Sequence, residues 1–295
     1  MRMRALLSVA AMITVGVAVQ TVDLSTATAA CAFSVSSIAP AAAFTSGGVP
    51  TIITGCGFSG AGTLSVTFGS AAPIVVAPAS DTSLSVVAPA NSPGTVTVTV
   101  RLHPASPPDS VASTSFTYVA IPTLTSMVPT RGPEKGGTSV EVTGTNLQPS
   151  GSSTSVKFGT TVSPTVSALT NTSLVALSPA GTGTQNVTAV VTLTGGATAT
   201  SNGLSYVYVP APTVTNVSPS SATLLGGTDV LITGTDFQPG ASVFFGPANG
   251  SSVDGSLPGD TPARPTSVLS STSIRATTPV GTVGATNIVV VNPDG

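Results

Sequence analysis

Charged side chains are scarce in this sequence. Lysine, arginine, aspartate and glutamate make up 6% of its 295 residues, whereas roughly 25% is usual for a soluble protein. The formal net charge is -2, and it becomes -3 without Arg2, Arg4 and Asp23 of the predicted targeting segment. The six cations that remain are scattered and cannot form a basic patch. We therefore expect neither nucleic acid nor an anionic membrane surface as a partner.

The residues that usually build catalytic sites are equally few. Tryptophan is absent, and the only histidine, His103, lies in a predicted hairpin loop without a cysteine or carboxylate cluster to share a metal ion. A Ser-His-Asp triad could nominally pair His103 with Asp109, but the sequence has no Gly-x-Ser-x-Gly elbow to present a nucleophile. The only glutamates, Glu134 and Glu141, are expected in a turn and on the outward side of a strand, which does not suit a glycosidase pair. We expect a solvated histidine, no metal, no cofactor and no enzymatic activity.

Small and β-branched residues take the place of the missing charges. The chain contains 31 glycines and 25 prolines among many threonines, serines, alanines and valines. A chain with few aromatic residues, many β-branched residues and frequent glycine and proline favours an all-β fold with many turns. Disorder is the competing interpretation of such a composition. The regular alternation of Val, Ile, Leu and Phe argues against it.

The N-terminus has the three parts of a secretory signal. Residues 1–4 are cationic, residues 5–19 are mostly apolar, and residues 28–30 are small. The apolar run is shorter than the roughly 20 residues that span a bilayer, so an uncleaved anchor is the lesser alternative. We predict a signal peptide over residues 1–30, a secreted or cell-surface protein, and no membrane insertion after cleavage.

The rest of the chain is an internal repeat with a period near 90 residues. Pro40, Pro129 and Pro219 are 89 and 90 residues apart, and a Phe-Gly pair recurs at Phe68 and Phe158. The repeat predicts three units, over residues 31–119, 120–209 and 210–295. A unit of this size with about seven short strands suits an immunoglobulin-like sandwich. Other positions that recur are Phe245; Ser83, Ser173 and Ser273; and Pro89, Pro179 and Pro279.

Strands inside unit 2 can be predicted from its residue pattern. Residues 139–143 alternate between apolar and polar, which predicts a half-buried strand. Residues 187–193 are expected to pair with residues 204–208 across a turn at 194–196.

The units are expected to be joined stiffly. The joints at residues 119–122 and 209–212 are short and contain proline, so we predict a semi-rigid, monomeric string of sandwiches.

Units 2 and 3 resemble IPT/TIG domains, the immunoglobulin-like domains of plexins and certain transcription factors. The resemblance implies three tandem β-sandwiches and, for bacterial proteins of this kind, secreted or surface-attached repeat proteins with adhesive or spacer roles. Unit 1 is more divergent, because Val49-Pro50 follows its glycine pair and Cys56 replaces a threonine. The residues that carry the resemblance are Pro122, Leu124, Met127, Pro129, Gly136-Gly137-Thr138, Val140, Val142, Gly144 and Asn146-Leu147 in unit 2, and Pro212, Val214, Val217, Pro219, Gly226-Gly227-Thr228, Val230, Ile232, Gly234 and Asp236-Phe237 in unit 3.

Both cysteines belong to unit 1. Cys31 precedes its first strand and Cys56 follows its second, and these strands are antiparallel neighbours in the fold that the resemblance implies. We therefore expect a Cys31–Cys56 disulfide, which export permits and which contributes roughly 3 kcal/mol in the chain-entropy model. Free or lipidated thiols are the alternatives. Lipidation usually requires a large aliphatic residue where this chain has Thr28.

Unit 3 departs from the repeat in two places. Residues 247–272 are about 13 residues longer than the matching stretch of unit 2, and long loops on a rigid scaffold often carry binding function. The polar residues of this longer stretch form a candidate partner-contact loop, and the alternatives are a plain solvated loop and a calcium site. Unit 3 also stops before a final strand, which indicates a partial gene or truncated chain, or strand donation by a partner. The candidate loop residues are Asn249, Asp254, Asp260 and Arg264.

The sequence therefore predicts a non-catalytic adhesion, protein-interaction or spacer module. Its partner would be an extracellular protein or polysaccharide, because the composition disfavours nucleic acid and membranes. The alternative is a set of accessory domains, including carbohydrate-associated ones, in a longer secreted enzyme. Finding a catalytic domain downstream in the open reading frame would favour that alternative.

Overall fold

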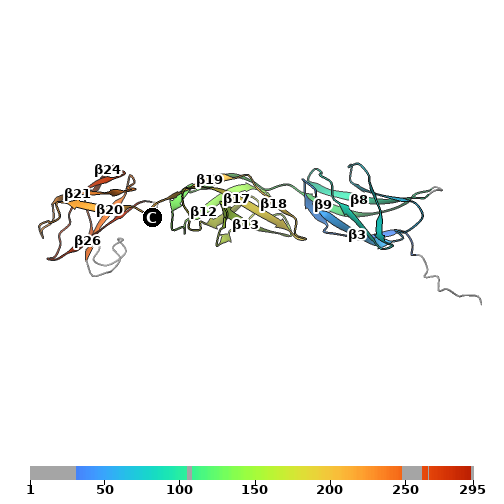
Figure 1. Cartoon of the computed structure of the whole chain (residues 1–295), viewed down its shortest axis with the longest axis horizontal. Helices are drawn as coiled ribbons and strands as arrows, with labels where there is room; N and C mark the ends of the chain where they lie inside the picture. The colour runs from blue at the N-terminus through green and yellow to red at the C-terminus, as the bar shows by residue number, and fades with distance from the viewer. Residues whose placement is uncertain (1–30, 105–107, 248–260, 265, 294–295) are drawn as a thin grey trace, which may run out of the picture.

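The computed structural model describes residues 31–104, 108–247, 261–264 and 266–293, which form three β-sandwiches in a row (Figure 1). All the regular elements in these ranges are strands, and none of the described residues forms a helix long and apolar enough to cross a membrane. The predicted fold class, a tandem array of three immunoglobulin-like sandwiches, is confirmed. The predicted signal peptide, residues 1–30, lies outside the described residues.

Unit 1 contains two facing sheets. Its strands are β1 (Ser34–Ala39), β2 (Ala42–Phe44), β3 (Pro50–Cys56), β4 (Thr63–Phe68), β5 (Ile74–Val76), β6 (Pro78–Ser80), β7 (Ser83–Val87), β8 (Gly94–His103) and β9 (Ser110–Val119). One sheet has the order β1-β3-β7-β6, and the other has the order β2-β9-β8-β4-β5. The chain changes sheet between β1 and β2, so that β2 pairs in parallel with β9.

Unit 2 repeats this plan. Its strands are β10 (Thr123–Val128), β11 (Arg131–Pro133), β12 (Ser139–Thr145), β13 (Ser152–Phe158), β14 (Thr161–Val162), β15 (Val166–Ser167), β16 (Ser173–Leu177), β17 (Thr184–Leu193), β18 (Thr198–Thr200) and β19 (Leu204–Val209). The sheets have the orders β10-β12-β16-β15 and β11-β19-β17-β13-β14, and β18 pairs with β17. The strands of each of these two units therefore pair with one another.

Unit 3 repeats the first sheet fully and the second in part. Its strands are β20 (Thr213–Ser218), β21 (Asp229–Thr235), β22 (Ser242–Pro247), β23 (Thr261–Pro262), β24 (Thr266–Ser270), β25 (Ser273–Thr277) and β26 (Thr286–Val291). The sheets have the orders β20-β21-β25-β24 and β23-β22-β26. Among the described strands, β22 alone pairs with β26, which leaves the other side of β26 without a strand.

Each core forms where the apolar faces of its two sheets meet. In β12 the alternation places Val140 and Val142 inside and Glu141 outside, as a half-buried strand requires. Two tyrosines of β19 enter the core of unit 2, with ring centroids of Tyr206 and Tyr208 5.1 Å apart. Burial raises the pKa of Tyr208 to about 12, and the nearby Tyr206 adds to the rise. The Tyr208 hydroxyl thus stays protonated and donates to the carbonyl oxygen of Pro179 at 2.8 Å.

The repeated glycine pair serves as a tight turn against a neighbouring loop. Gly136 has a φ of +74°, and a Cβ there would lie 2.5 Å from the carbonyl carbon of Pro179. A side chain is excluded by both the left-handed conformation and the close backbone. Gly47 and Gly226 repeat the arrangement against Pro89 and Pro279. The recurrence of these prolines and glycines in the sequence thus reflects one contact, formed three times.

One predicted strand pairing was only partly correct. The strand across the turn at residues 194–196 is the short β18, whereas β19 pairs with the first part of β17, with Leu204 opposite Val187. Ser201 breaks the ladder, because its hydroxyl accepts a hydrogen bond from the Ala189 backbone N–H. Asn202 then bonds through its side chain to both backbone groups of Leu124 in the other sheet. A polar bridge between the sheets therefore interrupts the hairpin.

The first two sandwiches pack directly on each other. Phe44 of unit 1 is buried in a cluster with Val191 and Leu193 of unit 2, at the end of β17. The β17–β18 turn also approaches unit 1 closely, since a Cβ on Gly195 would lie 2.6 Å from Pro40 Cβ. Four more apolar residues flank this cluster: Ala42, Val119, Ala197 and Ala199.

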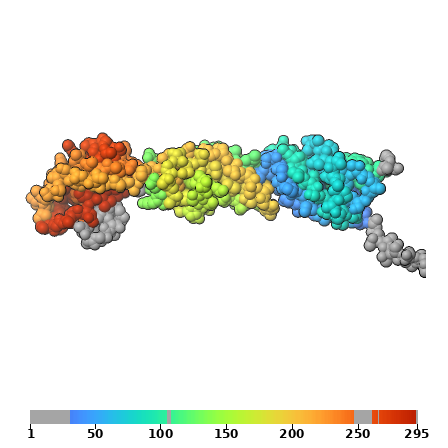
Figure 2. Space-filling view, in the orientation of Figure 1, coloured from blue at the N-terminus to red at the C-terminus, as the bar shows by residue number. Residues whose placement is uncertain are grey.

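The second junction contains a groove. Residues 133–135 of unit 2 and residues 290–292 of unit 3 line a groove there, with the linker residues Ala211 and Pro212 between them. The three units consequently follow one another as an elongated row of lobes (Figure 2).

Candidate functional site

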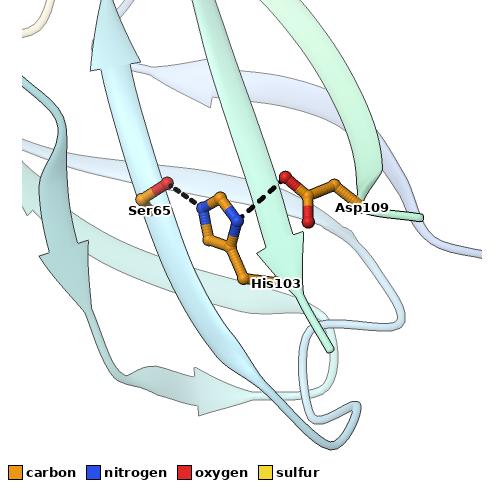
Figure 3. Close-up of polar contacts among 3 residues, drawn as sticks. All are labelled: Ser65, His103 and Asp109. Atoms are coloured by element: carbon orange, nitrogen blue, oxygen red, sulfur yellow. Dashed lines mark hydrogen bonds and ion pairs between the residues drawn. The ribbon is translucent and has the colours of Figure 1, made fainter. Parts of the chain in front are cut away.

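A chain of three polar side chains lies at one end of unit 1 (Figure 3). His103 ends β8, and the register of β8 with β4 places it diagonally across from Ser65. Asp109 directly precedes β9, which returns beside β8. The Ser65 Oγ atom lies 3.0 Å from His103 Nε2, and His103 Nδ1 lies 2.9 Å from Asp109 Oδ2. The two ring nitrogens of the histidine are therefore both engaged.

The expectation of a solvated loop histidine is only partly correct. His103 is the last residue of a strand and has a partner at each ring nitrogen, although its side chain remains 42% exposed. The sequence suggests the pairing of His103 with Asp109 but gives no sign of Ser65. No local signal marks Ser65 among the many serines of the chain, because only the strand register brings it to the histidine.

The connectivity is that of a Ser-His-Asp triad, but other parts of such a site do not match. Ser65 is 6% exposed, so its hydroxyl offers little access to a substrate. Its backbone lies in β4 between paired strands, opposite Val75 on one side and Arg101 on the other. Catalytic serines instead sit on exposed turns whose free N–H groups stabilise an oxyanion. We interpret the row of Ser65, His103 and Asp109 side chains as a structural link that joins β4, β8 and the start of β9.

We predict that Ser65 does not react as a nucleophile. A fluorophosphonate probe should label the wild-type chain no faster than the Ser65→Ala variant, because the hydroxyl is buried in a strand that is paired on both sides. Intact-mass spectrometry measures the labelling, and Ser85, an exposed serine of β7, provides a matched control as Ser85→Ala. Stoichiometric labelling that disappears only in Ser65→Ala would show that the triad is catalytic.

A disulfide between Cys31 and Cys56 lies next to a carboxylate in unit 1, with the two Cα atoms 5.8 Å apart. Cys56 ends β3 beside the start of β1, where Ser34 pairs with it. The Asp81 Oδ2 atom lies 3.5 Å from Cys31 Sγ. Asp81 also accepts a hydrogen bond from the Ser59 backbone N–H at 2.9 Å, which fixes its side chain against the Cys56 turn.

Most of the candidate partner-contact loop lies outside the described residues, including Asn249, Asp254 and Asp260. Arg264 is described and exposed. The later part of this stretch is not a plain loop, because it contains β23 and β24, and Ala263 between them is 5% exposed in the core. Strand pairing with β22 and β25 explains this order. The roles assigned to the four polar residues stay predictions.

Comparison with protein families matches the IPT/TIG domain model to residues 34–118, 122–208 and 212–295. No curated protein matches the sequence. The similar solved structures include the plexin A4 full extracellular region, which is 20% identical; the match covers 89% of this chain and 22% of that chain, with a TM-score of 0.38. The chain thus spans less than a quarter of that region.

Two Bacteroides structures are also similar. SGBP-B from a complex xyloglucan utilization locus in Bacteroides uniformis is 16% identical, with 89% of this chain and 94% of that chain covered and a TM-score of 0.25. SGBP-B of the Bacteroides ovatus mixed-linkage glucan utilization locus, in complex with a mixed-linkage heptasaccharide, is 14% identical. That match covers 86% of this chain and 60% of that chain with a TM-score of 0.23.

Proposed function

Because the chain belongs to the IPT/TIG domain family, with three tandem copies, we propose that it is an exported, non-catalytic rod. It holds its sandwiches in a fixed row and presents their surfaces to an extracellular protein or polysaccharide. The Cys31–Cys56 disulfide supports a location outside the cytoplasm, where disulfides form and persist. The domain boundaries remain those predicted from the repeat, at residues 31–119, 120–209 and 210–295.

The packing between the first two sandwiches is the observation that carries this proposal. Phe44 is 2% exposed although it is not part of the core of its own unit, and unit 2 supplies its apolar neighbours. A phenylalanine buried between domains stabilises one orientation of the units, because any hinge motion would expose it to water. A flexible junction would not keep this side chain buried.

The surface of the rod favours hydrogen bonds over ion pairs with a partner. Hydroxyl pairs cross the exposed face at the same place in two units, between Thr123 and Thr145 at 2.8 Å and between Thr213 and Thr235 at 2.9 Å. Each hydroxyl can donate and accept. A surface of this kind matches neutral polar partners such as polysaccharides better than charged ones, which supports the extracellular partner classes named above.

We predict that small-angle X-ray scattering of the chain gives the profile of a stiff rod. The Phe44→Ser variant should show a broader distribution of shapes, because it removes the main apolar contact between units 1 and 2 while their cores remain folded. Val75→Ser is the matched control, since Val75 is 72% exposed on unit 1. An unchanged profile for Phe44→Ser would contradict the stiff junction.

Binding experiments distinguish a presenting surface from a pure spacer. Saturable binding of the chain to an extracellular-matrix protein or a soluble polysaccharide would support presentation. Absence of saturable binding across both classes would leave the spacer role alone.

A further inference from the structure

We propose that Cys31, Cys56 and Asp81 form a site for a thiophilic divalent cation when the disulfide is reduced. The locus would then hold unit 1 together in two mutually exclusive ways, by a disulfide or by a metal ion. This inference does not depend on the proposed rod function, because it concerns one end of unit 1 alone.

The donor atoms already converge. The two Sγ atoms and one carboxylate oxygen of Asp81 lie within 4.8 Å of one another. A tetrahedral zinc ion binds sulfur at about 2.3 Å and oxygen at about 2.0–2.2 Å, so the edges of its coordination polyhedron are roughly 3.5–3.8 Å long. The Asp81 Oδ2 to Cys31 Sγ distance of 3.5 Å matches such an edge.

Asp81 is fixed in place independently of the cysteines. It lies in the turn between β6 and β7, where the Phe58 backbone N–H donates to its carbonyl oxygen at 3.0 Å. The Ser59 N–H donates to Oδ1 at 2.9 Å, and the Gly57 N–H makes a longer contact to Oδ2 at 3.4 Å. These bonds join the carboxylate to the segment that follows Cys56. Reduction therefore leaves the third ligand where it is.

Reduction converts the disulfide into a pair of metal ligands. A dithiol reductant gives two electrons and two protons to the Cys31–Cys56 bond, which breaks into two thiols while the reductant closes to its own cyclic disulfide. The two sulfurs then separate to van der Waals contact, close to the sulfur–sulfur edge of a tetrahedral site. A divalent cation displaces both thiol protons as it binds.

The charges favour a cation at this place. Two thiolates beside the Asp81 carboxylate would carry a charge of three negative units in one small volume, which disfavours their ionisation without a cation. A divalent cation reduces this to one negative unit. Sulfur ligands select zinc, cadmium or cobalt over calcium or magnesium. Cys31 is exposed, so water can complete the coordination.

The test is a cobalt titration of the full chain. The protein is reduced with dithiothreitol, freed of the reductant without oxygen, and titrated with Co²⁺ while absorbance is recorded. We expect one equivalent to bind, with a thiolate-to-cobalt charge-transfer band and the visible bands of a tetrahedral ion, and zinc should displace it. The oxidised chain should show neither band, because its sulfurs are joined.

Variants separate the proposed site from two unstructured thiols. Asp81→Asn should weaken cobalt binding by at least about tenfold and alter the visible bands, because it replaces an anionic oxygen ligand with a neutral amide, and loss of a group that merely supports a ligand already costs about tenfold or more. Asp109→Asn, which changes another carboxylate of unit 1, should leave binding unchanged. Zinc should raise the melting temperature of reduced wild-type protein and have little effect on the oxidised form.

Three results would overturn the proposal. They are the absence of a charge-transfer band in the reduced wild-type chain, equal cobalt affinity and spectrum in Asp81→Asn, and equal binding by the oxidised chain. Should reduced unit 1 unfold, binding would come from flexible thiols and Asp81→Asn would have no effect, so the second result covers that case.

Discussion

Gly144→Ala is expected to lower the free energy of unfolding of unit 2 by about 3 kcal/mol or more, which is a severe effect for one methyl group. Gly144 lies opposite Leu124 in the pairing of β12 with β10. A Cβ there would lie 2.0 Å from the carbonyl oxygen of Thr123, and backbone atoms cannot move aside as a flexible side chain can. The methyl group would therefore force the two paired strands apart.

The matched control for this substitution is Gly137→Ala. Gly137 has a φ of +85°, but nothing lies within 4 Å of the position of a Cβ. Its substitution should cost only the strain of the left-handed conformation, about 1–2 kcal/mol. Hydrogen exchange of unit 2 amides, measured in the full chain, reports the stability of that unit separately from its neighbours. If Gly137→Ala proved as destabilising as Gly144→Ala, close backbone contact would not explain why residue 144 is a glycine.

Phe158→Ala is expected to destabilise unit 2 by about 3–5 kcal/mol, the usual loss for a phenylalanine removed from a core. Phe158 is 2% exposed, and its ring meets Tyr206 edge-on, with centroids 5.1 Å apart. Removal leaves a cavity and also ends one of the two ring contacts of Tyr206. The loss of stability can be measured by urea denaturation with tyrosine fluorescence as the signal, because both tyrosines of unit 2 lie in this core.

Phe245→Ala in unit 3 provides the comparison. Phe245 occupies the repeated position of Phe158 and is 9% exposed. The ring pairs found among the described residues all lie in units 1 and 2. We therefore expect a smaller loss of stability in unit 3 than in unit 2, measured by hydrogen exchange of each unit. An equal loss would mean that the aromatic contacts contribute little beyond the burial of the phenylalanine itself.

Much of the fold could be predicted because its causes are local or repeated. The alternation around Val140 and Val142 follows directly from the period of a strand. The recurring Gly136 marks a turn that accepts no side chain, and it recurs because each unit needs the same contact. These features depend on residues close together in the chain, or on a pattern that three copies make visible.

The polar sites depended on strand register and loop placement. Ser65 and His103 are 38 residues apart, and they meet because β4 pairs with β8 in one particular alignment. Asp81 reaches the disulfide because the turn between β6 and β7 is hydrogen-bonded to the segment that follows Cys56. No periodicity distinguishes Ser65 or Asp81 from their neighbours, so the sequence alone indicates no role for these two residues.

Composition and a 90-residue repeat follow from residue identities alone, and they are sufficient to predict a non-basic chain of three similar all-β units with a likeness to IPT/TIG domains. The contact of Phe44 with a second unit, the two partners of His103 and the approach of Asp81 to the disulfide are visible only in the folded molecule. These contacts join residues that are distant in the chain. Their partners are selected by sheet register and domain packing, which no short stretch of sequence records.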